Sequence, residues 1–454
     1  MQPIIKNRSA LLSQGNRQGR EMILDIVDYA IGAIDSYRIT KNLVSVENLS
    51  RLIVGERNYN LSRIGNIYVV GAGKATFPVA QALVEVLGPR IKKGLIIVKK
   101  GQYGKLDQIR VVEAGHPLPD EEGMKGAEDV VEIANEAKKG DLVFCAITGG
   151  ASAMMPIPVE GVSLGDLRDL TDLLLKSGAS VNEINSVRKH VSAISGGGLA
   201  MQIHPAEIIN LIVVDEVASR PWGPTVPDVT TFKDAKIILK KYNLWGRVPL
   251  SIRRHLQTGL ANPNLETPKP ADFENLKVHN IILADNRIAC EMAKKKADAL
   301  GLNSLILSTV LEGESLHVGT VLASIAREIE ENGRPISPPC ALITGGETTV
   351  TISGKSSRGG PSQELALSFA LRIEGSAKIV FASVDTDGTD GPTDVAGGIV
   401  DGETVERAKD MRLDIYGSLM KHDSFNVLTK LKDGIFTGST GTNVMDLDVT
   451  LVLE

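Results

Sequence analysis

The chain of 454 residues is poor in cysteine and in aromatic residues, and it lacks any long hydrophobic run. Its three cysteines, Cys145, Cys290 and Cys340, are far apart and form no CxxC pair, which argues against a disulfide framework and a zinc site. No stretch of about eighteen apolar residues occurs, and the first twenty or so residues lack the apolar core of a signal peptide. We therefore expect a cytoplasmic protein with no membrane partner.

The sequence also lacks the charge and histidine patterns of two common classes of binding protein. Basic residues are scattered and the formal net charge is −5, so no arginine-rich or aromatic-interleaved surface is available for nucleic acid. The seven histidines include no HxxH or HxxxH pair. A nucleic-acid partner and a histidine-based transition-metal centre are therefore not expected.

The length exceeds the roughly 250–300 residues at which a single core stops growing, so two domains are expected. A polar, proline-rich stretch from Gly259 to Asp272 has the character of a linker. We place the boundary there, with an N-terminal domain at 1–265 and a C-terminal domain at 266–454.

Short apolar runs, each followed by a glycine-rich or acidic turn and a helical pattern, recur in both halves. They are Ile67–Val70, Gly94–Val98, Leu142–Ile147, Ile208–Val214, Val278–Leu283, Ser304–Leu307, Cys340–Ile343 and Ile379–Val384. Runs of this kind are typical of strands that are buried on both faces. The sequence predicts two α/β domains with largely parallel sheets, the first of them Rossmann-like.

A glycine turn that ends in a lysine, Gly71-Ala72-Gly73-Lys74, follows the first of these runs. It fits neither standard nucleotide loop, because a P-loop requires Ser or Thr at Ala75 and the dinucleotide fingerprint requires Gly or Ala at Thr76. The next strand ends in Lys99 rather than in the acidic residue that would bind a ribose. Taken alone, the lysine is either an anion-binding residue or a solvated side chain.

Two further turns of small residues offer exposed N–H groups that can cradle phosphate. One contains Gly149 and Gly150 just before Ser152, and the other contains Gly196 and Gly197. Lys189 lies between them along the chain. Each turn also has a simpler explanation, a close-packed crossing of backbone segments.

In the second half, Arg358 lies on a glycine-flanked loop, where its guanidinium is suited to bind carboxylate or phosphate. Four acidic residues between Asp385 and Asp394 follow an apolar run, but Ala396 occupies the position where an EF-hand requires glutamate. We interpret this run as a site for Mg²⁺ or for activation of a hydroxyl group. Together with the lysine and glycine turns, it favours phosphoryl transfer.

Seven ordered motifs resemble those of the glycerate kinases whose C-terminal portion is called the MOFRL domain. The motifs are VGAGKA at 70–75, EAGHP at 113–117, TGGASA at 148–153, GGETTV at 345–350, RGG at 358–360, TDGTDG at 386–391 and TGTNV at 440–444. The resemblance extends over nearly the whole length, from about Gly19 to Glu454.

This resemblance implies an ATP- and Mg²⁺-dependent kinase that phosphorylates D-glycerate, with its active site in the cleft between two α/β domains. It places Lys74 and Arg358 on the family's catalytic cations. We add Asp387 as a candidate catalytic residue, and we expect Ser152 and Glu347 to bind the substrate together with Lys74 and Arg358. The archaeal-type members make 2-phosphoglycerate. Gly149, Gly150, Lys189, Gly196 and Gly197 then become candidates for nucleotide and phosphate binding.

The chain departs from the family pattern after Asp215, where VASRPW replaces a Gly-Asp-rich turn. Because of this departure, the family pattern does not identify the Mg²⁺ ligands, and we choose Asp215 and Asp387 as candidates. Two other functions stay open: an NAD(P)H-dependent hydroxypyruvate reductase, and a non-catalytic protein that binds a sugar acid or a nucleotide. A homodimer also stays open.

Overall fold

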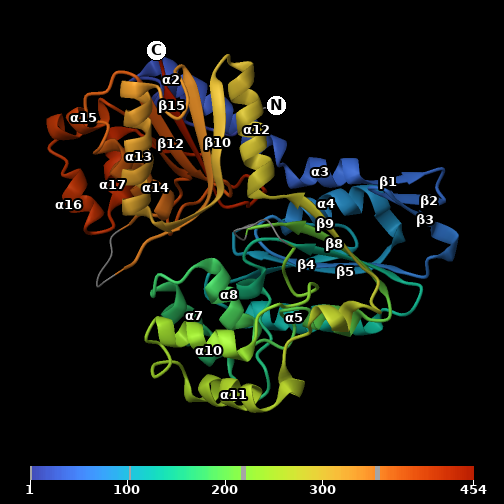
Figure 1. The fold of residues 1–454 in the computed structure, drawn as a ribbon. Helices are drawn as coiled ribbons and strands as arrows, with labels where there is room; N and C mark the ends of the chain where they lie inside the picture. The colour runs from blue at the N-terminus through green and yellow to red at the C-terminus, as the bar shows by residue number, and fades with distance from the viewer. Residues whose placement is uncertain (1–2, 102–103, 216–220, 353–357) are drawn as a thin grey trace. The chain divides into compact units, whose positions relative to one another are not determined.

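The computed structural model describes residues 3–101, 104–215, 221–352 and 358–454, which divide into two compact units (Figure 1). One unit contains the described residues between Ser36 and Leu283, and we call it the central unit. The other contains those of Met1–Asp35 and Ala284–Glu454, and we call it the terminal unit. Each unit has its own sheet and its own hydrophobic core.

This division differs at both ends from the domains predicted at 1–265 and 266–454. Residues 266–283 go with the central unit because β9 (Val278–Ala284) lies beside β8 (Glu207–Val213) in its sheet. The first 35 residues go with the terminal unit because α2 (Arg17–Ala33) packs against α12 (Asn286–Ala299). Local composition marked a linker, but strand pairing and helix packing decide which segments share a core.

The central unit is built on a six-stranded sheet with the order β6-β5-β4-β7-β8-β9. The pairs β4–β5, β5–β6, β4–β7 and β7–β8 are all parallel. The other strands of this sheet are β4 (Ile67–Ala72), β5 (Ile91–Lys99), β6 (Ile109–Ala114) and β7 (Leu142–Ile147). Every residue of β4 and β7 is buried, which explains their continuous apolar sequences and confirms the predicted parallel α/β sheet.

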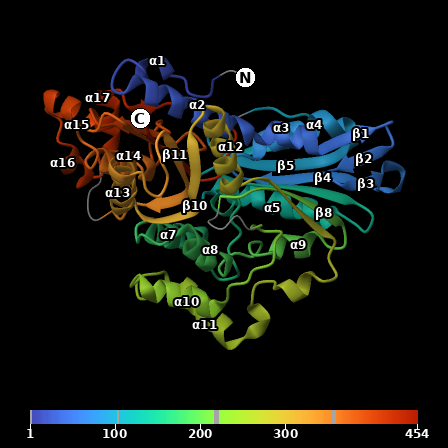
Figure 2. The same ribbon diagram turned by 45° about the horizontal axis from the view of Figure 1, so that its top comes forward.

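Helices and a small antiparallel sheet complete the central unit. The helices are α3 (Ser36–Leu43), α4 (Thr76–Leu87), α5 (Glu121–Glu136), α6 (Ala151–Met154), α7 (Leu164–Leu175), α8 (Val181–Lys189), α9 (Gly198–Ile203), α10 (Phe232–Lys241) and α11 (Leu250–Ala261). The small sheet contains β1 (Val44–Glu47), β2 (Arg51–Val54) and β3 (Arg57–Asn60). Figure 2 shows α7, α8, α10 and α11 gathered into one group, which has its own apolar core.

The sheet of the terminal unit is mixed, so the prediction of largely parallel sheets was wrong for this half. Its order is β10-β11-β15-β12-β13-β14, and only β10–β11 is parallel. The strands are β10 (Asn303–Glu314), β11 (Cys340–Thr349), β12 (Ile379–Asp385), β13 (Gly397–Asp401), β14 (Gly434–Ile435) and β15 (Asp446–Val452). The last strand of the chain inserts antiparallel between β11 and β12, which no local sequence pattern revealed.

The two faces of this mixed sheet are covered by different helices. Along β11, Ala341 and Ile343 pack with α2 and α12, whereas Cys340 and Leu342 pack with α13 and α14 on the other face (Figure 1). The helices of this unit are α1 (Arg8–Leu11), α13 (Ser315–Asn332), α14 (Pro361–Ala370), α15 (Thr404–Asp410), α16 (Ile415–Leu419) and α17 (Ser424–Leu431), besides α2 and α12. No helix in the described part of the chain is long and apolar enough to cross a membrane.

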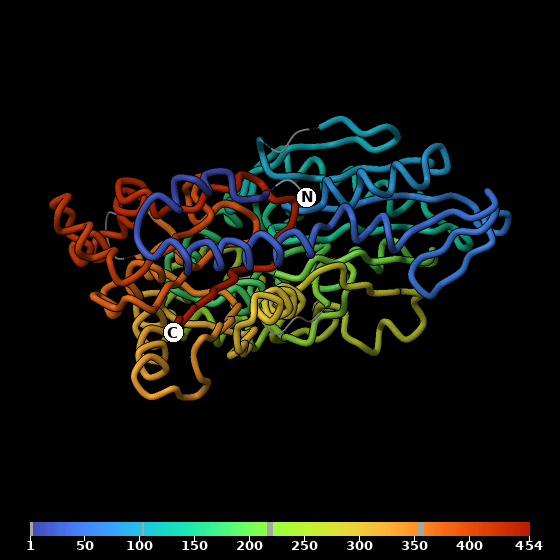
Figure 3. Tube along the Cα trace, turned by 90° about the horizontal axis from the view of Figure 1, so that it is seen from above, coloured from blue at the N-terminus to red at the C-terminus, as the bar shows by residue number. Residues whose placement is uncertain are grey.

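The N-terminal segment packs against the C-terminal part of the chain inside the terminal unit. Figure 3 shows blue N-terminal and red C-terminal segments side by side, and Lys6 N donates to Phe436 O at 2.8 Å. The side-chain amide of Asn7 also donates to Gly434 O at 2.8 Å. The N-terminal segment is therefore an integral part of this unit.

Candidate active site

Lys74 lies on a turn whose backbone is held firmly at the carboxyl edge of the central sheet. Its N–H donates to Gly149 O at 2.8 Å, so the two glycine-containing turns lie together, as expected from adjacent parallel strands. Gly73 has a φ of +131°, and a Cβ there would lie 2.2 Å from Thr148 Oγ1. A side chain at position 73 would therefore displace the turn that presents Lys74.

Thr148 ties this turn to the start of α4. Its Oγ1 accepts from Ala75 N at 3.0 Å and lies 3.1 Å from Thr76 Oγ1. Thr76 in turn donates to Ala146 O at 3.2 Å and is fully buried. A hydrogen-bonded threonine thus fills the place where a dinucleotide-binding turn has a small residue, and Lys99 ends β5 where such folds have an acid.

Positive charge gathers around His116 at the same edge of the sheet. Burial and then the charges of Lys74, Lys99 and Arg188 lower the pKa of His116 well below its usual value. The ring lies against Gly150, where an added Cβ would be 2.8 Å from His116 Cδ2. His116 is therefore neutral at physiological pH, and the charges around it are those of the lysines and the arginine.

Arg188 has no acidic partner to balance its charge in the part of the chain that the structure describes. Burial lowers its pKa to about 10, so it still carries its charge at neutral pH. A partly buried guanidinium without a carboxylate partner is costly unless an anion binds to it. We call the region around His116, Lys74, Lys99 and Arg188 the positive hollow.

The positive hollow is chemically suited to a carboxylate or phosphate group. The sequence pattern favoured Lys189 over its neighbour Arg188, and it gave His116 no role. His116 lies in the EAGHP motif and Arg188 is adjacent to Lys189. Only the packing of β6, α8 and the Lys74 turn brings these two side chains close together. The signal that would have revealed Arg188 is its position on a helix with a buried face.

Ser152 and Lys189, two of the predicted binding residues, line one small pocket. Asn185, Ser195 and Trp222 line it as well. Lys189 Nζ lies 3.6 Å from Asp228 Oδ1. Burial alone would raise the pKa of Asp228, but the Lys189 charge and other interactions outweigh it and lower that pKa. Lys189 is thus positioned at this pocket by a buried carboxylate.

The turn of Gly196 and Gly197 lies in the central unit too, with φ values of +57° and +95°. A Cβ at Gly196 would lie 3.1 Å from Asp228 Cβ, and one at Gly197 would lie 2.9 Å from the Phe273 ring. Packing alone therefore explains these two glycines. Their role in phosphate binding stays a prediction.

The terminal unit holds Arg358, Glu347 and Asp387. Arg358 is exposed, and its guanidinium carbon lies 4.2 Å from the centre of the Phe425 ring, which orients the fork without burying it. Glu347 lies near the carboxyl end of β11. Asp387 follows β12, and its Oδ1 accepts from Thr389 N at 2.7 Å and Thr389 Oγ1 at 2.8 Å.

A set of buried carboxylates lies near Asp387 and was only partly foreseen. Burial raises the pKa of Asp390 to about 7 and of Asp448 to about 6. Burial, and then the charges of Asp448, Asp390 and Glu347, also raise the pKa of Asp446 well above its usual value. Asp446 begins β15, far along the chain from the acidic run, so sequence patterns did not connect it to this site.

Of the two predicted metal ligands, Asp215 is in the central unit and Asp387 in the terminal unit. The described residues contain no group of three or more His, Cys, Asp or Glu side chains arranged for a metal ion. Residues 216–220, where the chain departs from the family pattern, lie outside the described residues. Mg²⁺ is commonly bound by one or two carboxylates together with the phosphates of a nucleotide, so the carboxylates of Asp215 and Asp387 are suitable ligands.

One sequence motif is typical of hydrolases, but its structure differs from that of a hydrolase active site. Residues 161–165 fit the G-x-S-x-G pattern of hydrolases, with Ser163 at the centre. Ser163 is the N-cap of α7, and its Oγ accepts from Asp166 N at 3.1 Å. Since the segment is not a turn from a strand into a helix, it is not a nucleophile elbow.

Comparison with known proteins places these features in context. Residues 22–257 match a model described as a domain of unknown function, DUF4147, and residues 340–446 match the MOFRL family. A glycerate 2-kinase from Pyrococcus horikoshii is 44% identical, over 95% of this chain and 97% of the relative. A D-glycerate 2-kinase from Thermotoga maritima is 38% identical, over 96% and 98%.

The fold is similar to a solved structure as well. A glycerate kinase from Thermotoga maritima matches with a TM-score of 0.76 at 37% identity, over 95% of this chain and 99% of that one. A relative from Agrobacterium vitis named as a putative hydroxypyruvate reductase is 36% identical, over 86% and 87%. Relatives with both kinds of name therefore match most of this chain.

Proposed function

Because this chain belongs to the glycerate kinase family that combines a DUF4147 region with a MOFRL domain, we propose that it transfers the γ-phosphate of ATP to D-glycerate and forms 2-phosphoglycerate. The observation that carries this proposal is the positive hollow, where Lys74 and Arg188 act on one neutral histidine. Phosphoryl transfer depends on positioning and on neutralising charge in the transition state, and this hollow supplies both.

Lys74 and Arg358 neutralise charge in the proposed mechanism. Lys74 contacts the transferring phosphoryl group or the glycerate carboxylate, and Ser152 orients the same substrate with a hydrogen bond. Arg358 supplies a planar fork of donors that pairs with two oxygens of one anion.

A carboxylate of the terminal unit activates the acceptor. Glu347 or Asp387 accepts a hydrogen bond from the glycerate hydroxyl and takes its proton as the reaction proceeds. The hydroxyl oxygen forms a bond to the γ-phosphorus while the bond from that phosphorus to the ADP oxygen breaks. ADP carries away the electron pair of the broken bond, so the phosphoryl group is transferred intact.

The nucleotide phosphates are assigned to the Gly149-Gly150 turn, to Lys189, and to Gly196 and Gly197. Asp215 and Asp387 would hold Mg²⁺, which, when bound, offsets negative charge on the phosphate oxygens. We assign these two aspartates because Mg²⁺ prefers oxygen ligands. It needs only one or two carboxylates when nucleotide phosphates supply the other ligands.

Product analysis tests this function directly. The protein is incubated with ATP, Mg²⁺ and each glycerate enantiomer, and the products are followed by ³¹P NMR and by a coupled assay for ADP release. We expect 2-phosphoglycerate from the D enantiomer at catalytic rates. Tight ATP binding without turnover of any sugar acid would indicate instead a non-catalytic binding protein.

A hydroxypyruvate reductase is the second candidate because a relative carries that name. Two residues argue against this function. Dinucleotide-binding folds have Gly or Ala at the position of the buried Thr76, and they have an acidic residue where Lys99 ends β5. Loss of NADH or NADPH absorbance with hydroxypyruvate, at rates comparable to known dehydrogenases, would overturn the kinase assignment.

A further inference from the structure

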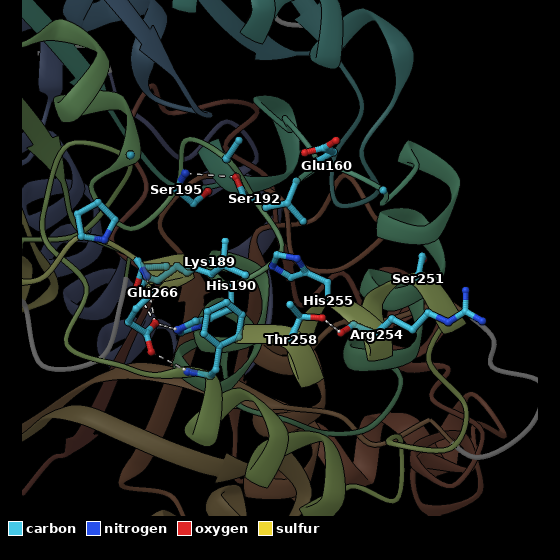
Figure 4. A pocket seen from close by; sticks show the side chains of 18 of the residues that line it. Glu160, Lys189, His190, Ser192, Ser195, Ser251, Arg254, His255, Thr258 and Glu266 are labelled. Carbon is cyan, nitrogen blue, oxygen red and sulfur yellow. Dashed lines mark hydrogen bonds and ion pairs between the residues drawn. The ribbon is translucent and has the colours of Figure 1, made fainter. Parts of the chain in front are cut away.

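A large cavity lies within the central unit, beside the turn of Gly196 and Gly197. Its volume is about 710 Å³, and it is lined by α11, by the ends of α8 and α10, and by the segments near residues 160, 193 and 266 (Figure 4). Cavities of roughly 300–1,000 Å³ are typical of sites for whole ligands the size of a nucleotide. Glycerate, a three-carbon acid, is far too small to fill it.

The walls of this cavity suit a flat heteroaromatic ring with attached hydroxyl groups. Phe232 and Leu265 provide apolar surface, and the ring of His255 lies 5.6 Å from that of Phe232. Thr258 and Ser192 contribute hydroxyl groups. Glu160 and Glu266 also line the cavity, and their carboxylates disfavour phosphate but accept hydrogen bonds from amino and hydroxyl groups.

One end of the cavity shares two wall residues with the small pocket of the candidate active site. Lys189 and Ser195 line both this cavity and the small pocket that contains Ser152. Ser152 follows the turn whose Gly149 carbonyl accepts from Lys74 N. Lys189 therefore lies between this roomy cavity, whose wall carries Arg254 as well as the two glutamates, and the positive hollow, where a chain of phosphates is best neutralised.

We propose that this cavity binds the nucleoside of the phosphoryl donor, with its phosphates running past Lys189 towards Lys74. The proposal rests on the kinase function and adds the location of the base and ribose, which the glycine turns do not supply. It also explains why the chain has no P-loop: the nucleoside is held by the α8–α10–α11 helices and the phosphates by separate turns.

Cysteine protection tests the location without relying on catalysis. The three native cysteines are buried, so Thr258→Cys, on the wall of the cavity, gives a single accessible thiol. We expect ATP and adenosine each to slow its reaction with a maleimide at least tenfold. Gln257→Cys, exposed on the same helix but not in the cavity wall, is the matched control and is not protected. Protection by inorganic triphosphate but not by adenosine would overturn the proposal.

A space-filling variant gives an independent kinetic test. Thr258→Trp is expected to raise the KM for ATP at least tenfold while the KM for glycerate changes less than twofold, and Gln257→Trp is expected to leave both unchanged. Circular dichroism confirms that each variant is folded. If the wild-type enzyme phosphorylates glycerate and Thr258→Trp has a normal KM for ATP, the cavity assignment is wrong and the kinase function stands. If the wild-type protein has no kinase activity, the proposed function fails, and adenosine protection of Thr258→Cys still decides the cavity.

Discussion

Arg20 Nε donates to Asp401 Oδ2 at 2.5 Å, although 381 positions separate the two residues along the chain. Its Nη1 donates to Asp433 Oδ1 at 2.8 Å, and all three side chains are buried. Burial alone would lower the pKa of Arg20, but the two carboxylates outweigh it and raise that pKa. This pairing anchors α2 to the strands of the terminal unit.

Replacing Arg20 with leucine is therefore expected to destabilise the terminal unit by about 3–5 kcal/mol, because two buried carboxylates lose a partner. Arg407, which also pairs with Asp433, keeps the loss from being larger. Denaturant unfolding followed by circular dichroism measures the change. Arg17→Leu, an exposed arginine on the same helix, is the control and is expected to change stability by less than about 0.5 kcal/mol. Equal unfolding midpoints for the two variants would contradict this role of Arg20.

The sequence revealed the central sheet better than the terminal one, for a physical reason. Strands β4 and β7 are buried on both faces, so each is a continuous apolar run that local patterns can find. The insertion of β15 between β11 and β12 and the pairing of Arg20 with Asp401 depend on contacts between distant segments. A local pattern contains no information about such partners.

The same distinction applies to the candidate site. Lys74 was found because a glycine turn precedes it, and the structure shows why: Gly73 has a backbone conformation and surroundings that exclude a side chain. Arg188, His116 and Asp446 gain their importance from neighbours far along the chain. Their electrostatic environment exists only in the folded protein.

Lys74→Met is expected to lower kcat with glycerate by about 10²–10³-fold, because an aligned positive charge beside the transferring group is lost. The fold should be unchanged, since the turn is held by backbone hydrogen bonds and by Thr148. A coupled assay for ADP release measures the rate. Lys100→Met, an exposed lysine paired with Asp120, is the control and should retain wild-type activity. A Lys74→Met enzyme with normal kcat would remove the central element of the mechanism.

Arg358→Ala is expected to lower kcat/KM by about 10²-fold or more, and Arg358→Lys to recover little of it, because lysine lacks the planar fork. Phe425→Leu should have a smaller effect, mainly on the KM, since it removes the ring over which the guanidinium lies. Initial rates at varied glycerate and ATP concentrations separate these effects. Arg334→Ala, at a surface ion pair of the same unit, serves as the control. Full recovery by lysine would show that charge alone, and not the fork, is needed.

The depressed pKa of His116 predicts a specific pH dependence of stability. Its folded-state pKa lies well below the ordinary value of 6.5, so below that pH the unfolded chain takes up a proton that the folded protein does not. The contribution to stability is complete above pH 6.5 and declines as the pH falls below it. Thermal unfolding between pH 5 and 8 should therefore show a smaller decline at acidic pH for His116→Gln than for the wild-type protein.

The exposed His204 provides the matched control, because His204→Gln should follow the wild-type pH dependence. Inorganic phosphate supplies a further test of the cause. If an anion binds among Lys74, Lys99 and Arg188, it offsets the charges that depress the pKa of His116, and the pH dependence of the wild-type protein should weaken while that of His116→Gln stays the same. Parallel curves for wild type and His116→Gln would mean that neither burial nor these charges lower the pKa of His116. If the curves differ but phosphate leaves the wild-type pH dependence unchanged, no anion binds among the three cations and the positive hollow is not an anion site.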